Sequence, residues 1–179
     1  MNNCGKFLAM LACVIAALTV NATGSGPILA VYFSPHGGAQ QAIVREIDGA
    51  REIIQVQAYS FTSAPIAAAL VAAHRRGVQV ETLLDKSNRT AQYSAATFLK
   101  HGGIPVLIDA KPAIAHSKIM IIDQATVITG SFNFTKAAEE ANTENLLIIK
   151  DAPELVQKYL RNYACRRALS DSYREKNYE

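Results

Sequence analysis

The chain is poor in cysteine, and this limits how its fold can be held together. Of its three cysteines, Cys4 and Cys13 fall within the first 22 residues, and only Cys165 lies beyond them. A single cysteine cannot form a disulfide within its own chain, so the fold must depend on a hydrophobic core. We expect Cys165 to be a half-buried helix residue, with a bridge between two chains as the alternative.

Several catalytic signatures are also missing. No cluster of Cys and His has the spacing of a metal site, no glycine-rich loop precedes Lys-Ser or Lys-Thr, and no Gly-x-Ser-x-Gly occurs. These absences argue against a metalloenzyme, a P-loop protein and a serine hydrolase of that type, and we expect neither metal nor cofactor. The formal net charge of +3 is too small to identify a polyanionic partner by itself.

Residues 1–22 have the features of a secretory signal peptide. Lys6 is their only charge, residues 7–20 form an apolar run, and Val20-Asn21-Ala22 has the small-residue pattern of a cleavage site. The run is short for a membrane span, which needs about 20 apolar residues. We therefore expect a periplasmic or secreted protein with no stable membrane anchor after cleavage. An uncleaved anchor and a lipoprotein modified at Cys13 are the alternatives.

Residues 23–179 read as one domain, because strand and helix patterns alternate without a repeat or a linker. Periodicity predicts strands at 27–33, 53–59, 78–84, 104–108 and 145–150, helices at 40–50, 63–76 and 90–100, and a hairpin over 115–133. The last helix begins with a capping box, Asp151-x-x-Glu154, and the polar tail 166–179 is expected to fray. This order predicts an α/β/α sandwich: a mixed, mostly parallel β-sheet with helices on both faces.

The most informative stretch is the predicted hairpin. His116 and Lys118 are two residues apart, which in a strand puts both side chains on one face, and Ser131 and Asn133 have the same spacing on the partner strand. Lys118 lies within a run of isoleucines, where burying an ammonium is costly without an anion. An imidazole, an ammonium, a hydroxyl and a carboxamide gathered above an apolar sheet indicate a site for a tetrahedral anion such as phosphate.

The spacing His-x-Lys, four residues, Asp, six residues, Gly-Ser-x-Asn resembles the motif of the phospholipase D superfamily. The positions that match it without a gap are His116, Lys118, Asp123, Gly130, Ser131 and Asn133, and Glu144 stands where the family often has a carboxylate. In length, leader and single motif copy, the chain is most similar to the small bacterial endonucleases of that superfamily, the Nuc group. The resemblance implies that a covalent phosphohistidine forms and that water then resolves it.

The candidate roles follow from what phosphodiester hydrolysis requires. His116 attacks phosphorus through one ring nitrogen, provided that an acceptor holds the other, and Glu144 is the candidate acceptor. Lys118 supplies a positive charge for the equatorial oxygens. Asn133 supplies an amide donor, and Ser131 supplies a hydroxyl or a backbone N–H.

Two members of the motif, Asp123 and Gly130, are expected to be structural. Asp123 lies seven residues from His116, an odd separation that points it to the opposite face of a strand, where it shapes the turn or pairs with a buried base. Outside the motif, Lys86 and Arg89 follow a predicted strand. They are candidates for contacts with a phosphate backbone, with a solvated loop as the alternative.

The scheme needs a second, protonated histidine to donate a proton to the leaving group. The chain has one motif copy, since neither His36, His74 nor His101 is followed by lysine two residues on. A twofold homodimer would bring the two copies of His116 together, and His36 acting within one chain is the rival. We therefore predict an exported, metal-independent endonuclease that cuts DNA with little sequence preference, with RNA left open. The alternatives are a phospholipase D or phosphatidyl transferase with the same site, and a non-catalytic nucleic-acid-binding domain.

Overall fold

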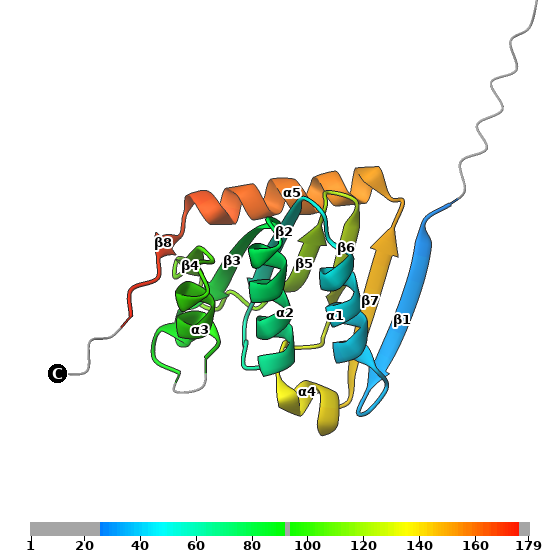
Figure 1. Ribbon diagram of the computed structural model, residues 1–179, viewed down its shortest axis with the longest axis horizontal. Coiled ribbons are helices and arrows are strands. Elements are labelled where there is room, and N and C mark those ends of the chain that lie inside the picture. The colour runs from blue at the N-terminus through cyan, green and yellow to red at the C-terminus, as the bar shows by residue number, and fades with distance from the viewer. Residues whose placement is uncertain (1–25, 92–93, 176–179) are drawn as a thin grey trace, which may run out of the picture.

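The computed structural model describes residues 26–91 and 94–175, so the predicted signal peptide at 1–22 lies outside the described residues. The described chain forms an eight-stranded sheet with helices on both faces, which confirms the predicted single-domain α/β/α architecture (Figure 1). In this part of the chain, no helix combines the length and the apolar character needed to cross a bilayer.

The elements alternate largely as predicted. The strands are β1 (Ile28–Ser34), β2 (Ile53–Ala58), β3 (Gln79–Asp85), β4 (Val106–Asp109), β5 (Lys118–Ile122), β6 (Thr126–Gly130), β7 (Glu144–Lys150) and β8 (Asp171–Ser172). The helices are α1 (Ala39–Gly49), α2 (Ala64–Arg75), α3 (Ala96–His101), α4 (Lys136–Glu140) and α5 (Pro153–Ala168), with a short 3₁₀ helix, η1 (Lys86–Arg89).

The strand order is β1-β7-β6-β5-β2-β3-β4-β8, which puts the motif hairpin in the middle of the sheet. Only the β2–β3 and β3–β4 ladders are parallel, and the other five are antiparallel. The expectation of a mostly parallel sheet is therefore wrong. The reason is that β5, β6 and β7 follow one another as antiparallel neighbours, and β1 joins the sheet antiparallel to β7.

Helices α1, α2 and α3 cover one face of the sheet, and α5 crosses the other (Figure 1). The larger core lies under α1–α3 and includes Ile47 and Leu70. A smaller core lies under α5, where Val156 and Tyr163 pack on the sheet. The alternation of a strand supplies both cores: in β5, Met120 and Ile122 belong to the larger core, and Ile119 and Ile121 belong to the smaller one.

The helix predicted over 90–100 is shorter in the structure. The chain leaves β3 in η1, where the Asp85 carboxylate accepts the Ser87 N–H at 2.9 Å, and α3 begins only at Ala96. The Asn88 amide fixes this segment by donating to the carbonyls of Tyr59 and Asp85 at 2.7 and 3.1 Å. These hydrogen bonds are polar, and the one to Tyr59 spans 29 residues, so hydrophobic periodicity does not reveal them.

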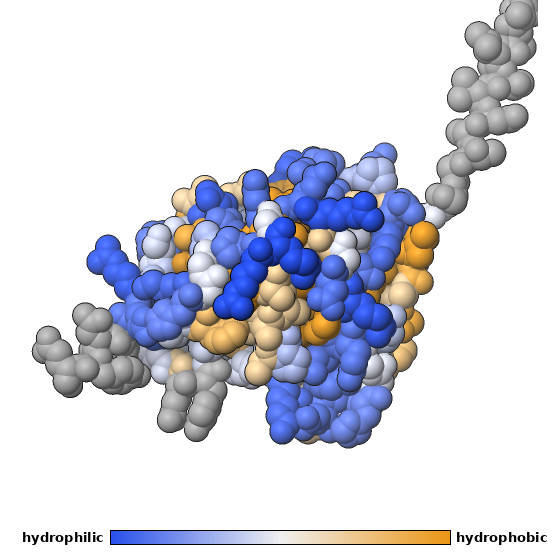
Figure 2. Space-filling view, in the orientation of Figure 1, coloured by the Kyte–Doolittle hydropathy of each residue, from blue (hydrophilic) through white to orange (hydrophobic). Residues whose placement is uncertain are grey.

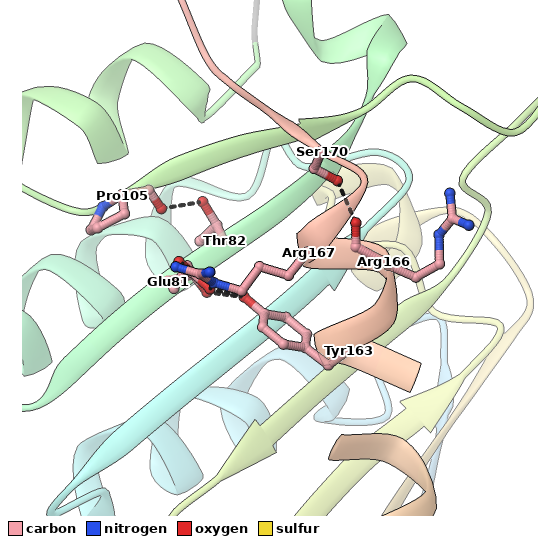
Figure 3. Close-up of polar contacts among 7 residues, drawn as sticks. All are labelled: Glu81, Thr82, Pro105, Tyr163, Arg166, Arg167 and Ser170. Atoms are coloured by element: carbon pink, nitrogen blue, oxygen red, sulfur yellow. Dashed lines mark hydrogen bonds and ion pairs between the residues drawn. The ribbon is translucent and has the colours of Figure 1, made fainter. Parts of the chain in front are cut away.

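The chain after residue 165 belongs to the fold, contrary to the expectation that 166–179 would fray. Arg166 donates to both oxygens of the buried Asp109 carboxylate at 2.7 and 2.6 Å. Arg167 pairs with Glu81 at 2.7 Å, and the Tyr163 hydroxyl donates to the same carboxylate at 3.0 Å (Figure 3). These partners on β3 and β4 fasten the end of α5, after which β8 extends the sheet beside β4. Residues 176–179 lie outside the described residues.

Two smaller expectations about α5 are also wrong. Its start has no capping box: Ala152 is the N-cap residue and no side chain caps it, because Asp151 has a left-handed φ of 55° and Pro153 opens the helix. Cys165 is exposed on the helix surface rather than half-buried. Its thiol is therefore accessible, and a bridge between two chains stays a prediction.

Strand β1 is an edge strand with an apolar outer surface. Its sequence, ILAVYFS, contains no charged residue, and Ile28, Leu29, Val31 and Phe33 are each more than half exposed. They contribute to the hydrophobic margin over β1 in Figure 2. Among the described strands, β1 pairs only with β7, so its other backbone edge is open to a further strand.

Candidate active site

The motif residues meet at one edge of the sheet. Lys118 opens β5, Gly130 closes β6 and Glu144 opens β7. Because neighbouring antiparallel strands start and end at the same edge, these three positions lie together. The predicted site residues that line one open groove of about 480 Å³ there are His116, Lys118, Gly130, Ser131, Asn133 and Glu144.

Lys118 is the buried cation of this groove. It is only 7% exposed, and its Nζ lies 3.0 Å from His116 Nδ1 and donates to the His116 carbonyl at 2.7 Å. The Tyr59 ring lies beside it, with 5.1 Å between Nζ and the ring centroid. Burial lowers the pKa of Lys118, and attraction to the Glu144 carboxylate opposes that shift. An anion bound in the groove would favour the charged form further.

His116 is exposed, and its ring packs at a tilt on Tyr59 with 4.5 Å between centroids. An ammonium can only donate hydrogen bonds, so the contact with Lys118 makes Nδ1 an acceptor. A neutral imidazole in that contact carries its proton on Nε2. Attack through Nε2 therefore requires the ring to exchange this contact for one in which Nδ1 donates its proton.

The loop before His116 is fixed by Asp85 at the end of β3. Its Oδ2 accepts the N–H of Ala115, the residue preceding His116, at 2.7 Å. Burial raises the pKa of Asp85, but hydrogen bonds from the backbone of Ser87 and Ala115 outweigh it, and the net pKa lies below the ordinary value. Asp85 and Tyr59 therefore position the imidazole, and neither belongs to the motif. The one sequence sign of them was their place at the ends of predicted strands.

Ser131 and Glu144 contact each other rather than His116. Ser131 Oγ donates to Glu144 Oε2 at 2.6 Å and accepts the Asn145 N–H at 3.0 Å, while Asn142 donates to Glu144 Oε1 at 3.2 Å. The expected contact between Glu144 and His116 is not formed among the described residues. The physical reason is the strand order: β6 lies between β7 and β5, and Ser131, which directly follows β6, contacts the Glu144 carboxylate.

Gly130 and Asn133 shape the other side of the groove. Gly130 has a φ of 142°, and a Cβ there would lie 2.3 Å from the Asn145 carbonyl oxygen. That close approach lets the same oxygen accept the N–H groups of Ser131 and Phe132 at 3.1 and 3.2 Å. The Asn133 carboxamide oxygen is buried and has no partner among the described residues, so it can accept a hydrogen bond, whereas an anion would have to be bound by the N–H₂ of the same amide.

Asp123 lies at the far end of β5, outside the groove. Its carboxylate accepts the N–H groups of Arg51, Glu52 and Ile53 at 2.9, 2.8 and 3.0 Å. Burial raises its pKa, but these donors outweigh burial and leave the pKa below the ordinary value. Both Asp123 and Gln124 have a φ of 51°, as the tight hairpin turn requires. Asp123 thus joins the hairpin to the start of β2, and the length of β5 separates it from the groove that Lys118 lines.

Lys86 and Arg89 lie after β3, at the edge of the sheet that carries the groove, but they do not line it. Lys86 Nζ donates to the Pro112 carbonyl at 3.2 Å, and Arg89 pairs with Asp171 at 3.4 Å. Both side chains are exposed, so they remain candidates for contacts with a substrate that extends past the groove. Within 26–91 and 94–175, no group of three or more His, Cys, Asp and Glu side chains could hold a metal ion.

An imidazole beside a buried ammonium, with a hydroxyl and a carboxamide opposite, can attack and stabilise a phosphoryl centre. On an α/β/α scaffold, this arrangement defines the protein as a phosphodiesterase. The chain belongs to the phospholipase D superfamily, since residues 43–165 match the family model described as "Cardiolipin synthase, PLD-like domain".

Individual relatives agree with this assignment. A phospholipase D from Rickettsia bellii is 48% identical over 136 residues, which cover 76% of this chain and 67% of that protein. Nuc, a phospholipase D family member from Salmonella typhimurium, matches in structure with a TM-score of 0.79 and 40% identity, covering 83% of this chain and 99% of Nuc. NucT from Helicobacter pylori gives a TM-score of 0.75 and 26% identity, covering 82% and 99%. The resemblance to the superfamily and its Nuc group is thereby confirmed.

Proposed function

We propose that this phosphodiesterase is an exported endonuclease that hydrolyses DNA with little sequence preference and without a metal. The observation that carries the proposal is the pairing of an exposed His116 with a buried Lys118, with 3.0 Å between Nδ1 and Nζ, in an open groove. An open groove suits a phosphate within a long polymer, because the strand can enter at one end and leave at the other. The likeness to Nuc over almost all of that chain supports the same choice.

The reaction runs in two displacements. In the first, a ring nitrogen of His116 attacks phosphorus, the N–P bond forms, the P–O bond to the leaving alkoxide breaks, and an acid protonates that alkoxide. Lys118 neutralises the phosphoryl oxygens, and the amide N–H₂ of Asn133 donates hydrogen bonds to them. The Ser131 hydroxyl can donate to phosphate only after it exchanges its hydrogen bond to Glu144. In the second, water loses a proton to a base and attacks phosphorus, and the N–P bond breaks to restore the imidazole.

Two groups that this scheme needs are not in place around His116 in the described chain: an acceptor for its second ring nitrogen, and an acid that protonates the leaving group. Its Nδ1 faces Lys118, which is a donor, and the Glu144 carboxylate is held by Ser131 and Asn142. A twofold homodimer that faces two copies of His116 across one cleft supplies the missing acid, a contribution worth about 10²–10⁴-fold. The exposure of His116 at the sheet edge permits such an approach. Sedimentation of the active protein tests this, and a fully active monomer would contradict it.

His36 is the rival acid within one chain. It follows β1, whose Ser34 pairs in register with Glu144, so His36 lies at the same edge of the sheet. Its backbone N–H donates to the Glu139 carbonyl at 2.8 Å, which holds that turn in place. Loss of turnover in His36→Ala with dimerisation intact would assign the acid to His36. Retained turnover would leave the second His116 as the acid.

Phospholipase D activity at the same site is the second candidate function, because the 48% identical Rickettsia protein carries that name. The assay incubates purified protein with plasmid DNA, and separately with phosphatidylcholine vesicles, both in EDTA. We expect nicked plasmid and no choline. Released choline would favour the lipase, and bound but intact DNA would favour a non-catalytic binding domain. His116→Ala is the control and should retain DNA without cutting it.

Export is the remaining part of the proposal, and it rests on the sequence of residues 1–22. The intact mass of protein recovered from the periplasm or the medium should correspond to a chain beginning near residue 23, with no membrane anchor. A mass that includes Met1 would contradict cleavage.

A further inference from the structure

A second hollow shares His116 and Ser117 with the phosphate groove and is not explained by phosphate chemistry. It has a volume of about 230 Å³ and lies on the α5 side of the sheet, beside the loop that precedes His116. Its lining includes Gln57 from β2, Leu83 from β3, Ile114 from the loop, and Asn162 and Arg166 from α5. A ligand in this hollow would be next to a phosphate in the groove.

Gln57 carries a buried polar atom of the hollow that has no hydrogen-bond partner among the described residues. It is 5% exposed, lies between Leu83 and Ile119 in the strand register, and its carboxamide oxygen is buried with no hydrogen-bond partner among the described residues. Burying an amide in this way is costly unless something binds it. Because Gln57 lines the hollow, a ligand with its own N–H and C=O groups could supply the missing hydrogen bond.

The other side chains that line the hollow indicate the chemical character of the rest of that ligand. Leu83 and Ile114 are apolar, and Ile114 is 55% exposed in the free protein. Asn162, exposed on α5, adds a second amide. The charge of Arg166 is already neutralised, because both Asp109 oxygens accept hydrogen bonds from its guanidinium. The hollow therefore suits a neutral group with apolar faces and a hydrogen-bonding edge, rather than a second phosphate.

We propose that this hollow binds the nucleobase of the nucleotide whose phosphate occupies the His116 groove. The inference rests on the proposed nuclease function and deepens it. A nucleotide carries phosphate and base on one sugar, matching two hollows that meet at His116. The base packs its faces on Leu83 and Ile114 and directs its edge to the amides of Gln57 and Asn162. A choline head group, being a cation without N–H or C=O groups, would leave both amides unpaired.

The test compares two chromogenic esters, thymidine 5′-(p-nitrophenyl phosphate), which carries a base, and bis(p-nitrophenyl) phosphate, which does not. In Gln57→Leu, the ratio of kcat/KM for the thymidine ester to kcat/KM for the base-free ester should fall about tenfold, as expected for a lost hydrogen bond to a substrate edge. Asn162→Ala changes only an exposed side chain, so it remains informative if Gln57→Leu fails to fold, and it should lower the same ratio.

Gln55→Leu is the matched control. Gln55 lies two residues earlier on β2, and its buried oxygen also lacks a partner among the described residues, but it lines a different hollow with Glu81 and Arg167. The ratio should not change in this variant. An unaltered ratio in Gln57→Leu, or an equal loss on both esters, would overturn the base assignment while leaving the nuclease function intact. A wild-type protein that cuts no DNA would remove the nuclease function first, and this inference with it.

Discussion

Replacing Gly130 with alanine should lower both the stability of the protein and its rate of phosphodiester cleavage. At the φ of 142°, the new Cβ would lie 2.3 Å from the Asn145 carbonyl oxygen and 2.9 Å from its Oδ1. Ordinary van der Waals contact begins at 3.4 Å. Strands β6 and β7 would therefore have to move apart by about 1 Å at this point, since carbon in such close contact is strongly repelled.

That displacement would break the backbone hydrogen bonds that hold Ser131 in position. The Asn145 carbonyl accepts the N–H groups of Ser131 and Phe132 at 3.1 and 3.2 Å. Losing both, at about 1 kcal/mol each, and holding alanine at this φ, at about 1–3 kcal/mol, lowers the free energy of unfolding by about 3–5 kcal/mol. In the fraction that remains folded, a shift of about 1 Å in a phosphate-binding group lowers kcat about 10²-fold.

The assay is the rate of plasmid nicking per folded molecule, with urea unfolding of the same preparations to give the folded fraction. Gly49→Ala is the matched control, because a Cβ at the end of α1 meets nothing within 4 Å and both measurements should stay near wild type. A Gly130→Ala protein that nicks DNA at the wild-type rate would refute the claim that this glycine sets the position of Ser131.

The structure also predicts the direction of the effect for three other substitutions. Burial lowers the pKa of Lys118, and the Glu144 carboxylate opposes that shift. In Glu144→Gln, the alkaline limb of the kcat/KM profile should therefore move to lower pH, and an unmoved limb would contradict this. Asp123→Asn should reduce the free energy of unfolding by about 1–3 kcal/mol at pH 7, because a neutral amide replaces the carboxylate that accepts three backbone N–H groups. The folded-state pKa of Asp123 is lowered, so its contribution is present above 3.8 and lost as the pH falls, and the deficit in urea titrations should shrink below pH 4. Val31→Lys puts a charge on the exposed apolar edge of β1 and should reduce light scattering of concentrated protein without changing turnover; equal scattering would show that this edge does not self-associate.

The sequence predicts best those parts of the site whose residues are close together along the chain. His116 and Lys118 are two residues apart at the start of one strand, so alternation alone brings them together. Periodicity likewise located most helices and strands, because each buries its own apolar face. Such periodic signals operate within about 15 residues. The family resemblance rests instead on the longer motif that runs from His116 to Glu144.

The side-chain contacts that the sequence does not predict depend on which strands become neighbours in the sheet. The partner of Glu144 is Ser131 because β6 separates β7 from β5, an order that no local pattern contains. The hydrogen bond from Arg166 to Asp109 on β4 fixes the end of α5. This contact also depends on the fold, and the polar sequence of the tail does not predict it. The sequence places Gln57 in a strand, but only the packing of α5 on the sheet shows that its buried oxygen lacks a partner and lies in a hollow shared with His116.

Strand β5 explains why the motif joins a residue of the groove to a residue of the hairpin turn at a fixed spacing. Lys118 at its start faces the phosphate groove, and Asp123 just after its end binds three backbone N–H groups at the start of β2. The two ends are coupled, because β5 is paired along its length with β2 and over residues 120–122 with β6. A change of one residue between them would exchange the faces of Met120 and Ile121, which belong to different cores. Asp123 therefore helps the two ladders to hold the register that places Lys118 in the groove.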